Sequence, residues 1–143
     1  GETFWHRMGD VGYFDEQERF WFCGRKTHRV LAATGPMFTI PVEGIFNTHP
    51  KIYRSALVGV GKPGQQVPVL IVEPLAEVWP IGNQLSQQIK DELKLLGSQH
   101  WQTKTIQHFI LIKSLPVDIR HNSKIFREQL RGKAEDFLRS QAR

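Results

Sequence analysis

The sequence predicts a small mixed α+β domain with a β-hairpin, a short three-stranded sheet and flanking helices. Apolar, β-branched runs bounded by Gly and Pro predict the strands. Two later segments repeat apolar residues every three or four positions, which is the period of one helix face. Elements of this kind bury their apolar faces most simply as a sheet covered by helices.

The first predicted element is a hairpin over residues 11–23. Aromatic residues lie on both sides of residues 15–19, which read DEQER. Aromatic residues favour strands, and the acidic segment between them is expected to form the turn. Residues 30–33 are then expected to form a further strand, which the turn residues TGP at 34–36 end.

A short helix is expected over residues 41–47. It opens at Pro41, where a missing N–H costs nothing, and it stops before Pro50, because the residue preceding a proline disfavours the helical basin. The next two runs read YRSALVGV at 53–60 and VPVLIV at 67–72. Since they flank the turn sequence GKPG, they predict an antiparallel pair of strands.

Two longer helices and one more strand complete the domain. Residues 106–112 predict the third strand of the sheet. Gly97 is expected to close the first long helix, because Gly is common just beyond a helix end. The apolar positions that predict the helices are Leu85, Ile89, Leu93 and Leu96 over residues 83–96, and Ile125, Leu130, Ala134, Phe137 and Leu138 over residues 124–138.

Composition is that of an ordinary globular domain. The chain has 143 residues, of which 40% are hydrophobic and 23% charged, and it contains no apolar run of membrane-spanning length. The single Cys23 excludes an internal disulfide, and neither Cys nor His shows metal-ligand spacing, so no metal site is expected. One free cysteine fits a reducing, cytoplasmic setting.

The net charge of +5 leaves several partners open, from nucleic acid to a phosphate-bearing substrate. Basic residues are enriched after Lys113, but Glu128, Glu135 and Asp136 are interleaved with them. Such alternation is typical of a solvated helix face.

Two blocks of sequence carry groups suited to nucleotide chemistry. Residues 5–15 read WHRMGDVGYFD and are followed by GRK at 24–26, and residues 115–127 read LPVDIRHNSKIFR. The carboxylate of Asp10 can accept hydrogen bonds from both hydroxyls of a ribose, and Arg25 offers a fork of donors. The ammonium of Lys124 can stabilise negative charge that develops at phosphorus.

These blocks resemble the signature segments of the adenylate-forming enzymes, which include acyl-CoA synthetases, peptide-synthetase adenylation domains and luciferases. In that superfamily the first block reads approximately aromatic-R-T-G-D-x-G-Y-x-D, then G-R, and the second begins with L-P and ends with G-K-I-x-R. The resemblance covers nearly the whole chain. It implies that residues 1–25 end a large N-terminal adenylation domain and lead into a hinge, and that residues 26–143 form the mobile C-terminal lid domain.

The resemblance also implies a role for each matching residue. Lys124 would be the catalytic lysine that the lid brings in for adenylation, and Asp10 and Arg25 would bind the ribose of ATP and of the acyl-AMP. The hinge would lie at Lys26 and Thr27, where relatives usually carry Asp or Lys at the second position. ATP with Mg²⁺ would be bound mainly by the N-terminal domain upstream, which is the expected partner of this chain together with a fatty carboxylic acid.

Residues 30–38, which read VLAATGPMF, depart from the CoA-forming relatives. Those relatives usually carry a lysine and a glycine here, and the glycine lets the pantetheine arm pass close to the backbone. Gly35 is present, but the lysine position is apolar and the following residues are bulky. These differences argue against CoA as a substrate.

Residues 119–122, which read IRHN before Ser123 and Lys124, look like the olefin-biosynthesis branch of the superfamily. Its members adenylate a 2-alkyl-3-hydroxy fatty acid and let the β-hydroxyl close a β-lactone, without CoA. Such an internal hydroxyl can have a very large effective concentration. His28 or His121 could act as its general base, although a lone histidine beside a motif is more often a surface residue.

Two alternatives remain open from the sequence. The first is a long-chain fatty acyl-CoA synthetase, in which the CoA thiolate attacks the same acyl-AMP. The second is a stand-alone module that binds nucleic acid through its basic C-terminal helix. Stacking on bases would favour aromatics among basic residues, whereas Phe14, Phe20 and Trp21 lie beside acidic ones, so no nucleic-acid partner is expected.

Overall fold

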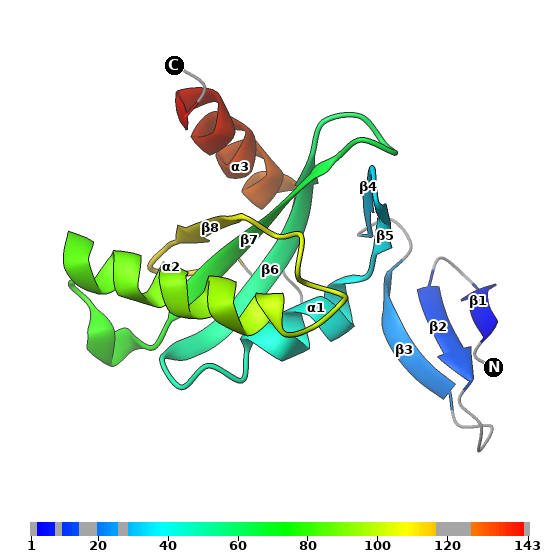
Figure 1. Ribbon diagram of the computed structural model, residues 1–143, viewed down its shortest axis with the longest axis horizontal. Helices are drawn as coiled ribbons and strands as arrows, with labels where there is room; N and C mark the ends of the chain where they lie inside the picture. Colours follow the sequence, from blue (N-terminus) through cyan, green and yellow to red (C-terminus); the bar gives the residue numbers. More distant parts are fainter. Residues whose placement is uncertain (1–2, 8–9, 15–19, 26–28, 117–126, 142–143) are drawn as a thin grey trace.

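The structure is a computed structural model that describes residues 3–7, 10–14, 20–25, 29–116 and 127–141, with the backbone alone before residue 29 and at 127, 128 and 141. The chain begins with an antiparallel sheet of β1 (Thr3–Arg7), β2 (Asp10–Phe14) and β3 (Phe20–Arg25). A small hairpin follows, made of β4 (Val30–Ala32) and β5 (Gly35–Met37). Figure 1 shows the first sheet at one side of the molecule, beyond helix α1 (Thr39–Phe46).

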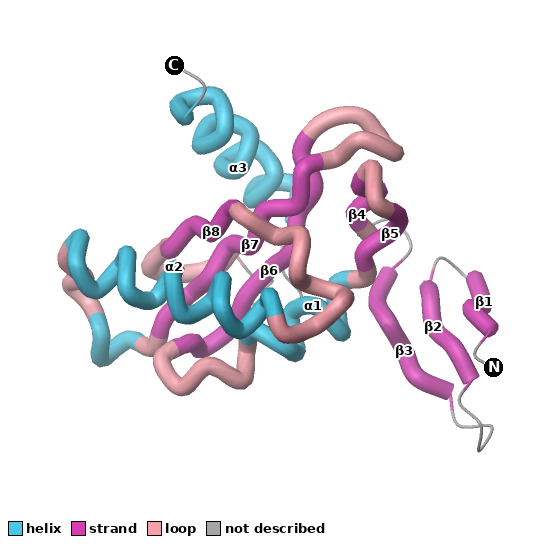
Figure 2. The backbone as a smooth tube through the Cα atoms, in the orientation of Figure 1, coloured by secondary structure: helices cyan, strands magenta, loops and turns pink. Residues whose placement is uncertain are grey.

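The main sheet has the order β6-β7-β8. Strands β6 (Ile52–Val60) and β7 (Val67–Pro74) are antiparallel, and β8 (His108–Leu111) is parallel to β7. The crossover to β8 passes through the short 3-10 helix η2 (Ala76–Val78) and α2 (Asn83–Ser98). Helices α1 and α2 lie on one side of the sheet and α3 (Arg127–Gln141) on the other (Figure 2).

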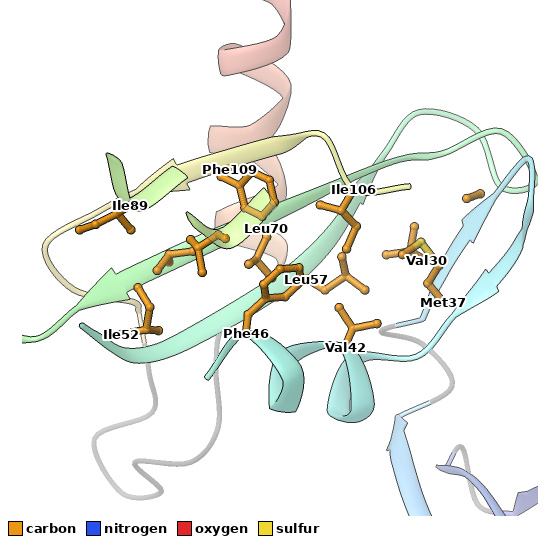
Figure 3. Packing of buried hydrophobic residues seen from close by; sticks show 13 residues of the cluster. Val30, Met37, Val42, Phe46, Ile52, Leu57, Leu70, Ile89, Ile106 and Phe109 are labelled. Atoms are coloured by element: carbon orange, nitrogen blue, oxygen red, sulfur yellow. The ribbon is translucent and has the colours of Figure 1, made fainter. Parts of the chain in front are cut away.

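The larger core cluster fills the space between the sheet and helices α1 and α2. Phe46 from α1 packs edge-on against Phe109 from β8, with ring centroids 5.6 Å apart (Figure 3). Ile89 and Leu93 of α2 are fully buried in the same cluster, as their spacing predicted. The remaining buried members are Val30, Ala32, Met37, Val42, Ile52, Leu57, Leu70, Val72 and Ile106.

The smaller cluster lies on the opposite face of the sheet, under α3. It combines small and branched residues of β6 and β7 with one apolar side of the helix. Strand β7 is therefore buried on both faces, which explains why its sequence is a continuous apolar run. The buried members are Ala56, Val58, Val69, Ile71, Leu115, Leu130 and Ala134.

Helix α1 and the residue that follows it each contribute a polar side chain that bonds to β6. The carboxylate of Glu43 accepts a hydrogen bond from the backbone N–H of Leu57 (2.8 Å), and the amide oxygen of Asn47 accepts one from the hydroxyl of Ser55 (2.8 Å). A sheet edge otherwise exposes backbone donors and acceptors. These bonds give Glu43, which is only 8% exposed, a partner in the interior.

The predicted fold class and most of the predicted elements are confirmed. The hairpin expected over residues 11–23 corresponds to β2 and β3, and the two apolar runs form the antiparallel pair β6 and β7. The strand expected over 106–112 is β8, shortened to four residues. Within the described residues, no helix is both long and apolar enough to cross a membrane.

Two further differences from the sequence prediction lie between residues 30 and 46. The turn residues after β4 do not end the strand region, because Gly35 and Pro36 belong to a second strand that pairs back onto β4. Helix α1 begins at Thr39 rather than at Pro41, so the proline occupies the first turn, where its missing N–H still costs no helical hydrogen bond.

Gly97 does not close its helix but lies inside the last turn, buried in the core. A Cβ atom at this position would be 3.0 Å from Cζ of Phe46 and 3.3 Å from the carbonyl oxygen of Thr103. The sequence reading was wrong because it treated this glycine as a helix terminator. Gly97 is small because the ring of Phe46 packs directly against its backbone.

We expect Gly97→Ala to lower the free energy of unfolding by about 1–3 kcal/mol, because the added methyl group overpacks the core. Gly132→Ala is the matched control, since it also changes a helical glycine but a Cβ there meets nothing within 4 Å. It should raise stability by about 0.5–1 kcal/mol. Urea unfolding of both variants measures the difference, and equal effects would contradict the packing argument.

Candidate functional site

Strands β2 and β3 bring the two predicted ribose-binding residues opposite each other. Asp10 is the first residue of β2, Arg25 is the last residue of β3, and the two are paired across the strands. The register shifts between Val11 and Gly12, next to this last pair. Asp10 and Arg25, which are fifteen positions apart in the sequence, therefore lie at the same end of the first sheet.

The other predicted site residues lie outside the described residues. These are the catalytic candidate Lys124, the hinge residues Lys26 and Thr27, and the possible general bases His28 and His121. Their roles stay predictions. The structure nevertheless describes both segments that lead to Lys124, one ending at Pro116 and the other beginning at Arg127.

The chain leaving β8 is fixed by two hydrogen bonds to β7. The backbone N–H of Ile112 donates to the carbonyl oxygen of Val72 (2.9 Å), which extends the parallel ladder by one residue. The backbone N–H of Leu115 then donates to Oε1 of Glu73 (2.6 Å). Where the ladder ends, the side chain of Glu73 thus accepts the hydrogen bond that a backbone carbonyl would otherwise accept. This bond is made by Leu115, the first residue of the second motif block.

The segment that follows Lys124 is fixed on the same face of the sheet. Leu130 and Ala134 of α3 are fully buried in the smaller core cluster, and Leu115 belongs to that same cluster. The first residue of the second motif block and the helix that follows the block therefore pack in one cluster on the α3 face.

Glu73 was not singled out by the sequence prediction, and neither was Arg54. A β-bulge between Ile52 and Arg54 sets Arg54 opposite Glu73 across the strands, and the guanidinium Nε donates to the same Oε1 at 3.0 Å. Glu73 is 7% exposed. The available signal was a carboxylate at the end of an otherwise apolar strand, because buried carboxylates need partners.

The hairpin of β4 and β5 is held against the turn between β6 and β7. The carbonyl oxygen of Leu31 accepts hydrogen bonds from the backbone N–H groups of Gly64 (2.7 Å) and Gln66 (3.0 Å). Oε1 of Gln66 in turn accepts the N–H of Leu31 (2.8 Å). Gly35 has a φ of +127°, a conformation that side chains rarely adopt, so backbone geometry alone is a reason for glycine here.

No protein-family model matches the chain, but individual proteins do. An olefin β-lactone synthetase from Xanthomonas campestris pv. campestris is 54% identical over 125 residues, which is 87% of this chain and 22% of that protein. The chain belongs to the adenylate-forming enzymes. A 4-hydroxybutyrate–CoA ligase from Metallosphaera sedula is 26% identical over 132 residues, covering 92% of this chain and 22% of the ligase.

Solved structures of other adenylate-forming enzymes share the fold. The anthranilate CoA ligase AuaEII, solved in complex with anthranoyl-AMP, matches with a TM-score of 0.70 and 22% identity over 89% of this chain and 24% of that one. The chain spans about a fifth to a quarter of the length of the relatives it matches.

Away from its motif blocks, the chain has a buried histidine paired with a glutamate. His49 lies after α1, its Nε2 is 2.8 Å from Oε1 of Glu92 in α2, and its Nδ1 accepts the N–H of Lys51 (3.1 Å). Since Nδ1 accepts, Nε2 carries the proton and donates to the glutamate. The described residues contain no group of three or more His, Cys, Asp or Glu that could hold a metal ion.

The hydrogen bonds from His49 and Gln88 lower the pKa of Glu92 below its ordinary value of 4.5. A carboxylate with a lowered pKa stabilises the fold above pH 4.5, and this contribution is lost as the pH falls through the lowered pKa. Glu92→Gln should therefore remove part of the acid-induced loss of stability. Unfolding measured between about pH 6 and pH 3 tests this, with Asp91→Asn as the neighbouring control. An unchanged pH profile for Glu92→Gln would contradict it.

Proposed function

We propose that the chain is the C-terminal part of an ATP-dependent ligase that activates a fatty carboxylic acid as acyl-AMP and then closes a β-lactone from a 2-alkyl-3-hydroxy acid. The observation that carries this proposal is the 54% identity with an olefin β-lactone synthetase over 87% of the chain. The matching CoA ligase is only 26% identical over a similar length. The sequence IRHN before Lys124 supports the same branch.

We assign residues 1–25 to the end of the large adenylation domain and residues 26–143 to the mobile lid, with the hinge at Lys26 and Thr27. In support, β1, β2 and β3 form a sheet of their own, separate from the main sheet of β6, β7 and β8. Hinges are short loop segments that absorb large changes of backbone dihedrals between two packed units.

The reaction would proceed in two steps. A carboxylate oxygen of the fatty acid attacks the α-phosphorus of ATP, and pyrophosphate leaves. The β-hydroxyl of the same molecule then loses its proton and attacks the acyl carbonyl carbon, and AMP leaves as the four-membered lactone closes. We assign the Mg²⁺ that accompanies ATP to the upstream domain.

Three residues of this chain would act on the nucleotide. Asp10 and Arg25 would hold the ribose, which agrees with their pairing at one end of the first sheet. Lys124 would stabilise the charge that develops at the α-phosphorus during the first step. His28 and His121 stand as candidate bases for the β-hydroxyl in the second step.

A fatty acyl-CoA synthetase is the second candidate, because a CoA ligase also matches 92% of the chain. In that case the CoA thiolate would attack the acyl-AMP in place of the internal hydroxyl. The two candidates share the first step and differ only in the nucleophile of the second.

The full-length enzyme with ATP, Mg²⁺ and a 2-alkyl-3-hydroxy fatty acid should therefore form a β-lactone and AMP without CoA. Mass spectrometry of reactions with and without CoA identifies the products. An acyl-CoA that forms only when CoA is present would favour the second candidate instead. The acid without its 3-hydroxyl is the control, and it should stop at acyl-AMP.

Lys124→Ala in the full-length enzyme should slow adenylation by about 100- to 1,000-fold, because a preorganised charge at the reacting phosphate is lost. Exchange of labelled pyrophosphate into ATP measures this step. Ring closure from supplied acyl-AMP should change by less than about twofold, since the lysine acts only on the first step. Lys133→Ala, an exposed lysine on α3, is the control. Full adenylation by Lys124→Ala would reject the role of Lys124.

A further inference from the structure

The carboxylate of Glu73 connects the central strand with the start of the second motif block. Its Oε1 accepts the N–H of Leu115 at 2.6 Å and the Nε–H of Arg54 at 3.0 Å. The three residues come from β7, from the segment after β8 and from β6. One oxygen atom therefore ties three parts of the fold together at Leu115, the first residue of the second motif block.

Burial makes this connection strong. Glu73 is 7% exposed and Leu115 is 2% exposed, so water competes little for either group. A buried carboxylate is costly without donors, and a buried N–H is costly without an acceptor. Charge-assisted hydrogen bonds are also shorter and stronger than neutral ones, in agreement with the 2.6 Å separation.

Helix α3, which follows the block in the chain, packs on the same face. Leu130 and Ala134 are fully buried in the same cluster as Leu115. The polar anchor at Leu115 and the apolar anchor at Leu130 thus lie on one face of the sheet, before and after Lys124 in the chain. Losing the polar anchor would free one end of the block while the helix stays docked.

We propose that Glu73 is a positioning residue for the adenylation step, acting through the backbone of Leu115 on the segment that carries Lys124. This inference rests on the proposed function of Lys124. A catalytic group must be held within a fraction of an ångström of its productive position, and a displacement of about 1 Å can cost about 100-fold in rate. Glu73 touches neither ATP nor the acid, and it acts only by fixing the segment.

Glu43 provides a matched control for this role. It is also a buried glutamate, 8% exposed, whose carboxylate accepts one backbone N–H, that of Leu57 at 2.8 Å. Its bond to Leu57 joins α1 to β6, and α1 lies on the opposite side of the sheet from the α3 cluster that contains Leu115. Glu43→Ala and Glu73→Ala should therefore cost comparable stability, while only Glu73→Ala should affect the Lys124-dependent step.

The experiment uses the full-length enzyme with Glu73→Ala, Glu73→Gln and Glu43→Ala. Pyrophosphate exchange measures adenylation, and AMP release from supplied acyl-AMP measures the second step. Glu73→Ala should slow adenylation about 10- to 100-fold and change the second step by less than about twofold. Glu73→Gln should recover most of the rate, because its amide oxygen can still accept the N–H of Leu115. Hydrogen exchange of peptides that contain Leu115 should be faster in Glu73→Ala than in Glu43→Ala.

Each outcome separates the inference from the proposed function. If Glu73→Ala slows both steps equally, or if Glu43→Ala gives the same selective loss, Glu73 is a structural residue and the inference is wrong. If Glu73→Ala does not fold, Glu73→Leu, which fills the same space without an acceptor for the N–H of Leu115, takes its place, and an unaltered ratio of the two step rates in that variant overturns the inference. If the wild-type enzyme exchanges no pyrophosphate, or if Lys124→Ala keeps full exchange, the proposed function fails first.

Discussion

The burial of β7 on both faces is the constraint from which most of this structure follows. A strand without a solvent-facing side needs a layer of apolar side chains above and below it. Helices α1 and α2 supply one layer and α3 supplies the other, so each helix helps to bury a face of β7. The parallel pairing of β7 with β8 adds a second requirement, since parallel neighbours need a long crossover, which α2 provides.

The same strand also organises the polar groups at its end. Where its apolar run ends, Glu73 collects a donor from each side, Arg54 from β6 and Leu115 from the chain leaving β8. On the outer edge of the sheet, Glu43 accepts the backbone N–H of Leu57 from β6 in the same way. Carboxylates placed at the ends and edges of an apolar sheet thus replace the backbone partners that the sheet itself cannot offer.

Periodicity and motifs predicted most of the secondary structure and the family. The spacing of Ile89 and Leu93 predicted the buried face of α2, and the apolar runs predicted β6 and β7, because burial leaves a direct trace in composition. The motif blocks also led to the right family. Motifs report local chemistry, however, and could not predict that Asp10 and Arg25 are paired across two strands.

What the sequence could not predict depends on contacts between distant residues. Gly97 looks like a helix terminator until the ring of Phe46, from another helix, is placed against it. Glu73 looks like an ordinary strand-end carboxylate until the N–H of Leu115 reaches it. In both cases the residue contacts a neighbour more than forty positions away in the chain, and no local sequence pattern includes that neighbour.

The crossover from β7 to β8 also sets the order in which the chain can assemble. Helix α1 and the hairpin of β6 and β7 are contiguous in sequence, so their contacts close short loops and can form early. We expect Leu115 to be captured only after α2 has packed and β8 has paired, because the preceding hydrogen bond of the exit segment, from Ile112 to Val72, continues that pairing. The bond between Glu73 and Leu115 therefore depends on the parallel pairing that precedes it in the chain.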